Sequence, residues 1–154
     1  MLKNVLWVFL ISMLPVVELR GSILVGCSLD LPWWINYLVS VIGNFLPVPF
    51  LLLFIRQLLH WMKKVRYLDR FALFVENRAA KHSVKVLRYA SLGLFFFVAI
   101  PIPGTGAWMG ATIAALLDMR MKYALPTILC GILVAGVLVV CAGYGFLSFL
   151  SFLV

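Results

Sequence analysis

Two charged side chains, Glu18 and Arg20, stand two positions apart in an otherwise apolar stretch. An ionisable side chain in apolar surroundings is costly, and it usually serves binding or proton transfer beside a partner. On an extended turn the two side chains point the same way. They therefore either pair with each other as a structural ion pair or face a cavity together. In a cavity Arg20 would attract an anion, and Glu18 would couple that binding to protons when protonated and neutral.

A second set of candidates lies in "PIPGTGAW" at 101–108, where prolines and glycines interrupt another apolar stretch. The Pro-Gly cluster allows tight turns and close approach of a ligand, and Thr105 is predicted to cap the helix that follows. The free N–H groups of a helix start favour an anion, phosphate above all. We predict one substrate site from both breaks, formed by Arg20, Gly21, Ser22, Asn44, Pro103, Gly104, Thr105, Gly106 and Trp108.

Asn44 joins this set because it lies at about the mid-depth of a long apolar segment, just before Pro47. Asp30 and Asp118 are candidates for proton coupling with Glu18, although for Asp118 the sequence favours a surface ion pair with Arg120 or Lys122. The three cysteines show neither a CxxC pair nor a zinc spacing, so no metal and no cofactor is predicted. We also find no paired His and Asp and no nucleophile elbow, and we do not expect an enzyme.

The composition indicates a membrane protein. Of 154 residues, 65% are hydrophobic and only 12% are charged, with a mean hydropathy of +1.13. A soluble protein of this length could not cover so much apolar surface. Nine of the thirteen basic residues fall between Arg56 and Arg88. In this setting the basic segment is the positive-inside signal of a cytoplasmic loop, and no nucleic acid is expected.

Apolar segments that are too short to cross a bilayer occur twice, each pair separated by a break. Such pairs are typical of re-entrant hairpins, because irregular backbone at membrane depth must be covered by protein or water. We predict a single all-α membrane domain over 1–154. It comprises a re-entrant hairpin at 4–30, a spanning helix at 33–59, a basic amphipathic helix at 60–88, a second hairpin at 89–118 and a second spanning helix at 123–152.

The two halves align at an offset of 88 residues, which matches Asp30 with Asp118, Gly43 with Gly131 and Phe9 with Phe97. Because each half crosses the membrane once, the second half is predicted to be inverted. Segment 56–88 would then be cytoplasmic and both termini outside. Inverted repeats with broken helices at the midplane are the build of secondary transporters. Two spans form a thin wall, so a homodimer is expected.

Three motifs resemble the small multidrug export protein family: "PVVELRGSI" (15–23), "GNFLPVPF" (43–50) and "PIPGTGAWMGA" (101–111). That family is similar to the DedA superfamily of prokaryotic membrane proteins. The resemblance implies two re-entrant hairpins facing each other in the cytoplasmic membrane and proton-coupled movement of lipids, including undecaprenyl phosphate. It would give functional roles to Glu18 and Arg20, and more loosely to Asp30, Asp118 and Arg120.

The sequence therefore favours a transporter of an anionic amphipathic or lipid-linked substrate, with membrane lipids as partners. A small-molecule or multidrug exporter is one alternative. A membrane scaffold without transport, whose breaks serve only packing, is the other.

Overall fold

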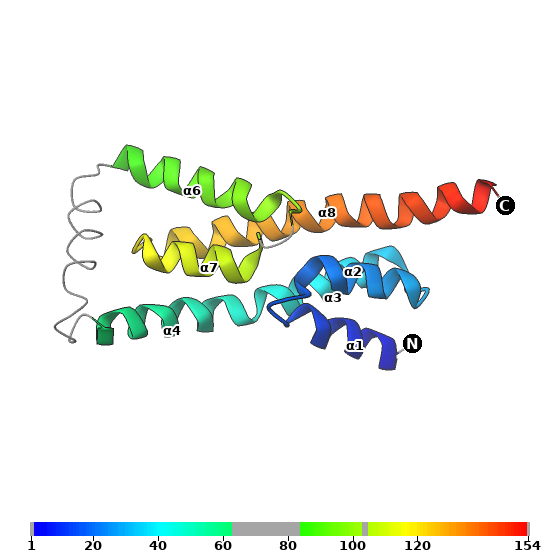
Figure 1. Ribbon diagram of the computed structural model, residues 1–154, viewed down its shortest axis with the longest axis horizontal. Coiled ribbons are helices and arrows are strands. Elements are labelled where there is room, and N and C mark those ends of the chain that lie inside the picture. The colour runs from blue at the N-terminus through cyan, green and yellow to red at the C-terminus, as the bar shows by residue number, and fades with distance from the viewer. Residues whose placement is uncertain (1, 63–83, 103–104, 154) are drawn as a thin grey trace.

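The computed structural model describes residues 2–62, 84–102 and 105–153, and every regular element in these ranges is an α-helix (Figure 1). The first half comprises α1 (Leu2–Ser12), α2 (Glu18–Ser28), α3 (Trp33–Phe45) and α4 (Pro47–Met62). The second half comprises α6 (Val84–Ala99), α7 (Ala107–Leu116) and α8 (Met121–Leu153). The predicted all-α class is therefore confirmed.

Two apolar stretches are long enough to cross a membrane. One runs through α3 and α4, over the 26 residues Trp33–Leu58, and the other covers the 25 residues Met121–Gly145 of α8. At 1.5 Å per residue each is about 38 Å long, more than the roughly 30 Å of a hydrocarbon core. The first is interrupted at Leu46, which keeps helical angles (φ −56°, ψ −43°). Pro47, which has no N–H to donate, begins α4 there, so the division of this span coincides with a proline.

The other helices are shorter. α1 and α2 have 11 residues each and α7 has 10, about half the length needed to cross a bilayer. α1 packs against α2, and α6 packs against α7. Figure 1 shows that the connection between α1 and α2, the end of α6 and the start of α7 all lie near the middle of the molecule. The start of α1 and the end of α8 lie together at one end of the molecule.

The core forms where α2, α3, α4, α7 and α8 pack together. Ile23, Leu52, Met119 and Ile128 are fully buried, and α7 contributes a face of small alanines that lets it lie close to its neighbours. The outer surface carries many large apolar side chains, including Trp7, Phe50, Phe54, Phe96 and Val137. An outer surface of this kind suits contact with lipid rather than with water.

The C-terminal ends of α2 and α7 have the same backbone geometry. Asp30 and Asp118 follow the two helices with φ of 53° and 49°. In each case the N–H of the residue after the aspartate donates to a helical carbonyl, from Leu31 to Gly26 at 3.1 Å and from Met119 to Ala114 at 3.0 Å. This is a Schellman motif, which stabilises the end of a helix through one left-handed residue.

Two glycines allow close helix packing in the two halves. A Cβ at Gly43 would overlap Ser12 Oγ and lie 2.8 Å from Phe9 O, so α3 lies directly on α1. A Cβ at Gly131 would lie 2.7 Å from Val98 Cβ and 3.2 Å from Phe95 O, so α8 lies equally close to α6. Only glycine permits either approach.

The predicted basic helix at 60–88 cannot be followed as one element. Its first residues belong to α4 and its last residues to α6, while 63–83 lies outside the described residues.

Candidate functional site

Glu18 is the first residue of α2 and is 9% exposed, with a left-handed φ of 49° that side chains other than glycine rarely adopt. Its carboxylate reaches across to the second hairpin. Oε1 accepts a hydrogen bond from the backbone N–H of Trp108 at 3.4 Å. Oε2 lies against Gly106, where a Cβ would overlap it. A strained backbone residue therefore places a negative charge at the start of α7.

Gly106 is the residue that caps α7, with extended angles (φ 176°, ψ −166°) and no side-chain cap of its own. The first N–H groups of a helix have no partner within the helix and carry a partial positive charge. The Glu18 carboxylate lies beside these groups, so α7 is capped by a side chain from the other hairpin. The prediction that Thr105 caps this helix is wrong, because the Thr105 hydroxyl bonds to the carbonyls of Ile100 and Ile102 and not to an N–H of α7.

Arg20 extends from α2 to the end of α6. Its guanidinium donates to the carbonyls of Ile102 and Ile100, the latter at 3.1 Å, and to Thr105 Oγ1 at 3.0 Å. The Thr105 hydroxyl itself lies 3.0 Å from Ile100 O and 2.9 Å from Ile102 O. Carbonyls at the C-terminal end of a helix carry partial negative charge, so a cation is stabilised there.

Glu18 and Arg20 thus bind the two sides of the second break: Glu18 at the start of α7, and Arg20 at residues that follow the end of α6 at Ala99. The sequence predicted either an internal ion pair or two side chains that face a cavity together. Both side chains line the same small cavity. They also contact the two sides of the second break, so the start of α2 holds that break in place. We call this arrangement the tip latch: the contacts of Glu18 with Gly106 and Trp108, and of Arg20 with Ile100, Ile102 and Thr105.

A small cavity of about 10 Å³ lies beside the tip latch. It is lined by residues of α2, α3, α6, α7 and α8, namely Glu18, Leu19, Arg20, Asn44, Val98, Gly106, Ala107, Ile132 and Ala135. This volume is about one water molecule. Asn44 is 2% exposed, and its Oδ1 finds no hydrogen-bond donor in the part of the chain that the structure describes.

Arg20, Asn44, Thr105, Gly106 and Trp108 lie close to Glu18, and their role in binding a substrate stays a prediction. The backbone of Trp108 contributes rather than its ring, although its buried Nε1 has no acceptor among the described residues.

Other predicted residues lie elsewhere. The Ser22 hydroxyl donates to Leu19 O at 2.9 Å within its own helix, and Gly21 lies against Val17. Asp30 and Asp118 are exposed at the far ends of α2 and α7, each about 15 Å along its helix from the tip latch. Pro103 and Gly104 lie outside the described residues.

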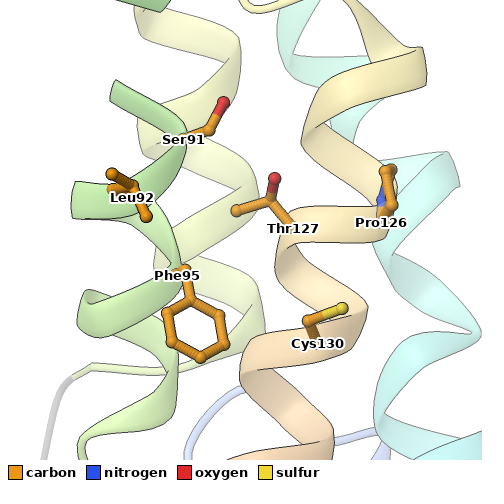
Figure 2. Close-up of a pocket in the computed structure, with 6 residues that line it drawn as sticks. All are labelled: Ser91, Leu92, Phe95, Pro126, Thr127 and Cys130. Carbon is orange, nitrogen blue, oxygen red and sulfur yellow. The ribbon is translucent and has the colours of Figure 1, made fainter. Parts of the chain in front are cut away.

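A larger groove opens on the surface between α6 and α8, with a volume of about 330 Å³ (Figure 2). Ser91, Leu92 and Phe95 line it from α6, and Pro126, Thr127 and Cys130 line it from α8. Its lining is largely apolar, and the Thr127 hydroxyl is already bonded to Tyr123 O at 2.7 Å. The groove can therefore hold a hydrocarbon group but offers little to fix a charge.

Two features escaped sequence reasoning. The acceptors for Arg20 are mostly backbone carbonyls, which no residue type reveals.

A buried polar group also joins α2, α3 and α8. Asn36 Nδ2 donates to Ile23 O at 2.8 Å and to Tyr144 Oη at 3.1 Å, and Tyr144 donates to Leu31 O at 2.6 Å. Asn36 in an apolar helix was the available signal for this group.

Among the described residues no three His, Cys, Asp or Glu side chains gather in a way that could hold a metal ion.

The comparison with protein families gives one match. Residues 18–138 match the family described as "Putative small multi-drug export protein", and the chain belongs to this family. The searches of curated proteins and of solved structures found no match. Family membership and two long apolar helices fit a membrane location. The relation to the DedA superfamily stays a prediction.

Proposed function

We propose that this chain is a membrane transporter whose two hairpin tips meet as a closed gate, and that it moves an anionic amphipathic substrate such as a lipid phosphate. The observation that carries this proposal is the Glu18 carboxylate at the start of α7, with Arg20 beside it. A built-in carboxylate already occupies a place suited to an anion. We do not expect catalysis.

The architecture proposed for this transporter is an inverted repeat of two re-entrant hairpins and two spans. Support comes from equal helix ends at Asp30 and Asp118 and from equal packing at Gly43 and Gly131. The pairs of packed helices also correspond, since α2 packs on α8 as α7 packs on α4. Helices that end at mid-depth need covered termini, and the tip latch supplies that cover.

The orientation follows from the basic residues. Arg120 and Lys122 lie at the start of α8, at the end of the molecule where α4 ends and α6 begins. The positive-inside rule makes this end cytoplasmic, with segment 56–88, and puts the start of α1 and the end of α8 outside. The expected location is the cytoplasmic membrane of a prokaryote, where membrane lipids are partners and a dimer covers the thin wall.

Proton coupling follows from competition at α7. A substrate phosphate can occupy the start of α7 only after the Glu18 carboxylate leaves, because two negative charges cannot share these N–H groups. Protonation removes the charge of Glu18 and so weakens its hold on the helix start. The proton and the anion then bind together, and the coupling expected is transport of both in the same direction.

The substrate tail has a place beside this headgroup site. The groove between α6 and α8 begins about 8 Å along α6 from the carbonyls that bind Arg20. It is apolar and faces the proposed lipid side, so the occupant that suits it is the hydrocarbon chain of the substrate.

Reconstituted vesicles test this proposal. A fluorescent polyprenyl phosphate should move between leaflets faster with the wild-type protein than in empty vesicles, and faster still with a proton gradient. Arg20→Ala should slow the movement at least tenfold. Wild-type vesicles that move the probe no faster than empty ones would refute the lipid-phosphate substrate.

A second candidate function is export of small apolar molecules. It is favoured by the family description and by the groove of about 330 Å³, which is large enough for a compact organic molecule. Efflux of a cationic dye that is independent of Arg20, with no movement of the lipid phosphate, would favour this function. Failure of both assays with a folded protein would favour a scaffold.

A further inference from the structure

The small cavity beside the tip latch is lined by the amide of Asn44 and by the carboxyl group of Glu18. Asn44 Oδ1 is buried and unpaired among the described residues, and it points to a ligand. The Glu18 carboxylate lines the same cavity and has lone pairs beyond the one bonded to Trp108 N–H. The other lining side chains, Arg20 apart, are apolar.

This arrangement limits the ligand. Both oxygens are acceptors and disfavour an anion, and a volume of about 10 Å³ admits one atom the size of oxygen. A metal cation would lie close to the positive charge of Arg20, which lines the same space. A water molecule fits this volume, is neutral and has two O–H donors for the two acceptors. Buried waters satisfy buried polar groups in this way in many proteins.

We infer that this cavity binds one water molecule, which donates one hydrogen to Asn44 Oδ1 and the other to the carboxylate of Glu18. Asn44 is then a positioning residue for Glu18. The water also explains how Asn44 can be buried, because an asparagine at the middle of an apolar span is costly unless both ends of its amide form hydrogen bonds.

The water also decides where a proton on Glu18 can point. The Glu18 carboxyl meets the N–H of Trp108 and lies against Gly106, and the Arg20 guanidinium lines the same cavity. The N–H and the guanidinium are donors. A protonated carboxyl needs an acceptor, and the water held by Asn44 is the one in this cavity. On the proposed function, the proton therefore reaches Glu18 from the Asn44 side.

The groups that face Glu18 come from every element around the cavity. α2 supplies Arg20, α3 supplies Asn44, and α7 supplies its N–H groups, while α6 and α8 present only Val98, Ile132 and Ala135. Removing the water should therefore leave the charged surroundings of Glu18 unchanged. What is lost is the hydrogen bond that the water donates to the carboxylate. This bond is stronger than the one that the water accepts from the neutral carboxyl, so the charged form loses more.

Infrared difference spectroscopy on the full chain in lipid nanodiscs tests this inference without substrate. The carbonyl stretch of protonated Glu18, assigned by its loss in Glu18→Gln, is followed against pH. Asn44→Leu, which fills the cavity, should raise the midpoint by about one pH unit, a tenfold change in proton affinity. It should also abolish a water O–H band that shifts in H₂¹⁸O. Ser40→Ala, one turn earlier on α3 and outside the cavity, should change neither.

Asn44→Ala serves as a second variant, since it removes the acceptor without adding bulk, and both variants are checked by thermal unfolding. An unchanged midpoint in both folded variants, or no isotope-sensitive band in the wild type, would overturn the inference. So would displacement of the band by Na⁺ or Tl⁺, which would make the cavity a cation site. A failed transport assay leaves this titration interpretable, so the water site and the proposed function fail separately.

Discussion

The carboxylate of Glu18 lies in the space that any side chain at position 106 would fill, so Glu18 and Gly106 are complementary across the two hairpins. Both positions are buried, and the backbone of Gly106 is extended, which alanine also adopts. The need for glycine at 106 thus comes from the neighbouring carboxylate and not from its own backbone.

Gly106→Ala should therefore displace Glu18 and destabilise the protein by about 1–3 kcal/mol, the usual cost of overfilling a packed site. The matched control is Gly93→Ala, because a Cβ at Gly93 meets nothing within 4 Å in α6. That change should raise the midpoint of thermal unfolding slightly, since alanine is the better helix former. Glu18→Ala should restore much of the stability of Gly106→Ala. If the destabilisations of Gly106→Ala and Glu18→Ala simply add up in the double variant, this contact is contradicted.

The contacts of Arg20 predict that lysine cannot replace it. Its guanidinium reaches two carbonyls and one hydroxyl at once, whereas an ammonium group has neither the planar shape nor the span for all three. We expect Arg20→Lys to slow transport nearly as much as Arg20→Ala, by at least tenfold. Thr105→Val removes only the hydroxyl contact and should have a smaller effect. Full activity of Arg20→Lys would show that charge alone suffices.

Binding of an anionic lipid should depend on pH with a definite sign. Protonated Glu18 frees the start of α7, so the substrate should bind more tightly as the pH falls through the titration of Glu18. Glu18→Gln resembles the protonated form and should bind with high affinity at every pH. Binding of a lipid phosphate to protein in nanodiscs, measured from pH 5 to pH 8, checks this. Tighter binding at high pH would reverse the coupling proposed.

Much of the helical plan is readable from the sequence, because length and hydropathy decide which segments can cross a bilayer. The division between α3 and α4 at Pro47 and the two breaks follow from proline and glycine. The match between Asp30 and Asp118 corresponds to a shared helix end. The match of Phe9 with Phe97 is wrong in register, since Phe9 and Phe95 play the same part against Gly43 and Gly131. The offset changes from 88 to 86 because the second break is longer.

The residues of the tip latch were also largely predictable, since charged and glycine-rich breaks stand out in an apolar chain. Their contacts were not. The acceptors for Arg20 are carbonyls of Ile100 and Ile102, which sequence letters do not show. The cap of α7 comes from Glu18 on a distant helix rather than from the adjacent Thr105. Contacts between distant segments depend on packing, and local propensity cannot provide them.

The groove between α6 and α8 makes Cys130 a reporter for the substrate tail. Cys130 and Cys141 are both exposed on α8, whereas Cys27 is 7% exposed, and only Cys130 lines the groove. A bulky maleimide on Cys130 in a Cys141→Ser background should slow movement of a long-chain lipid phosphate severalfold. The same label on Cys141 in a Cys130→Ser background is the control and should have little effect. Equal effects at both sites would exclude the groove as the place of the tail.

The last prediction concerns Asp30 and Asp118. The sequence makes them candidates for proton coupling, whereas their positions suggest that they only end helices. Their backbone angles fit a helix end, where glycine or asparagine serves as well as aspartate. We expect Asp30→Asn and Asp118→Asn to transport at the wild-type rate, and Asp118→Gly to be as stable as the wild type. Asp118→Val should lose about 1–2 kcal/mol, since a branched side chain resists the left-handed conformation. If Asp118→Asn folds normally but uncouples transport from the proton gradient, its carboxylate carries protons, and Glu18 does not act alone.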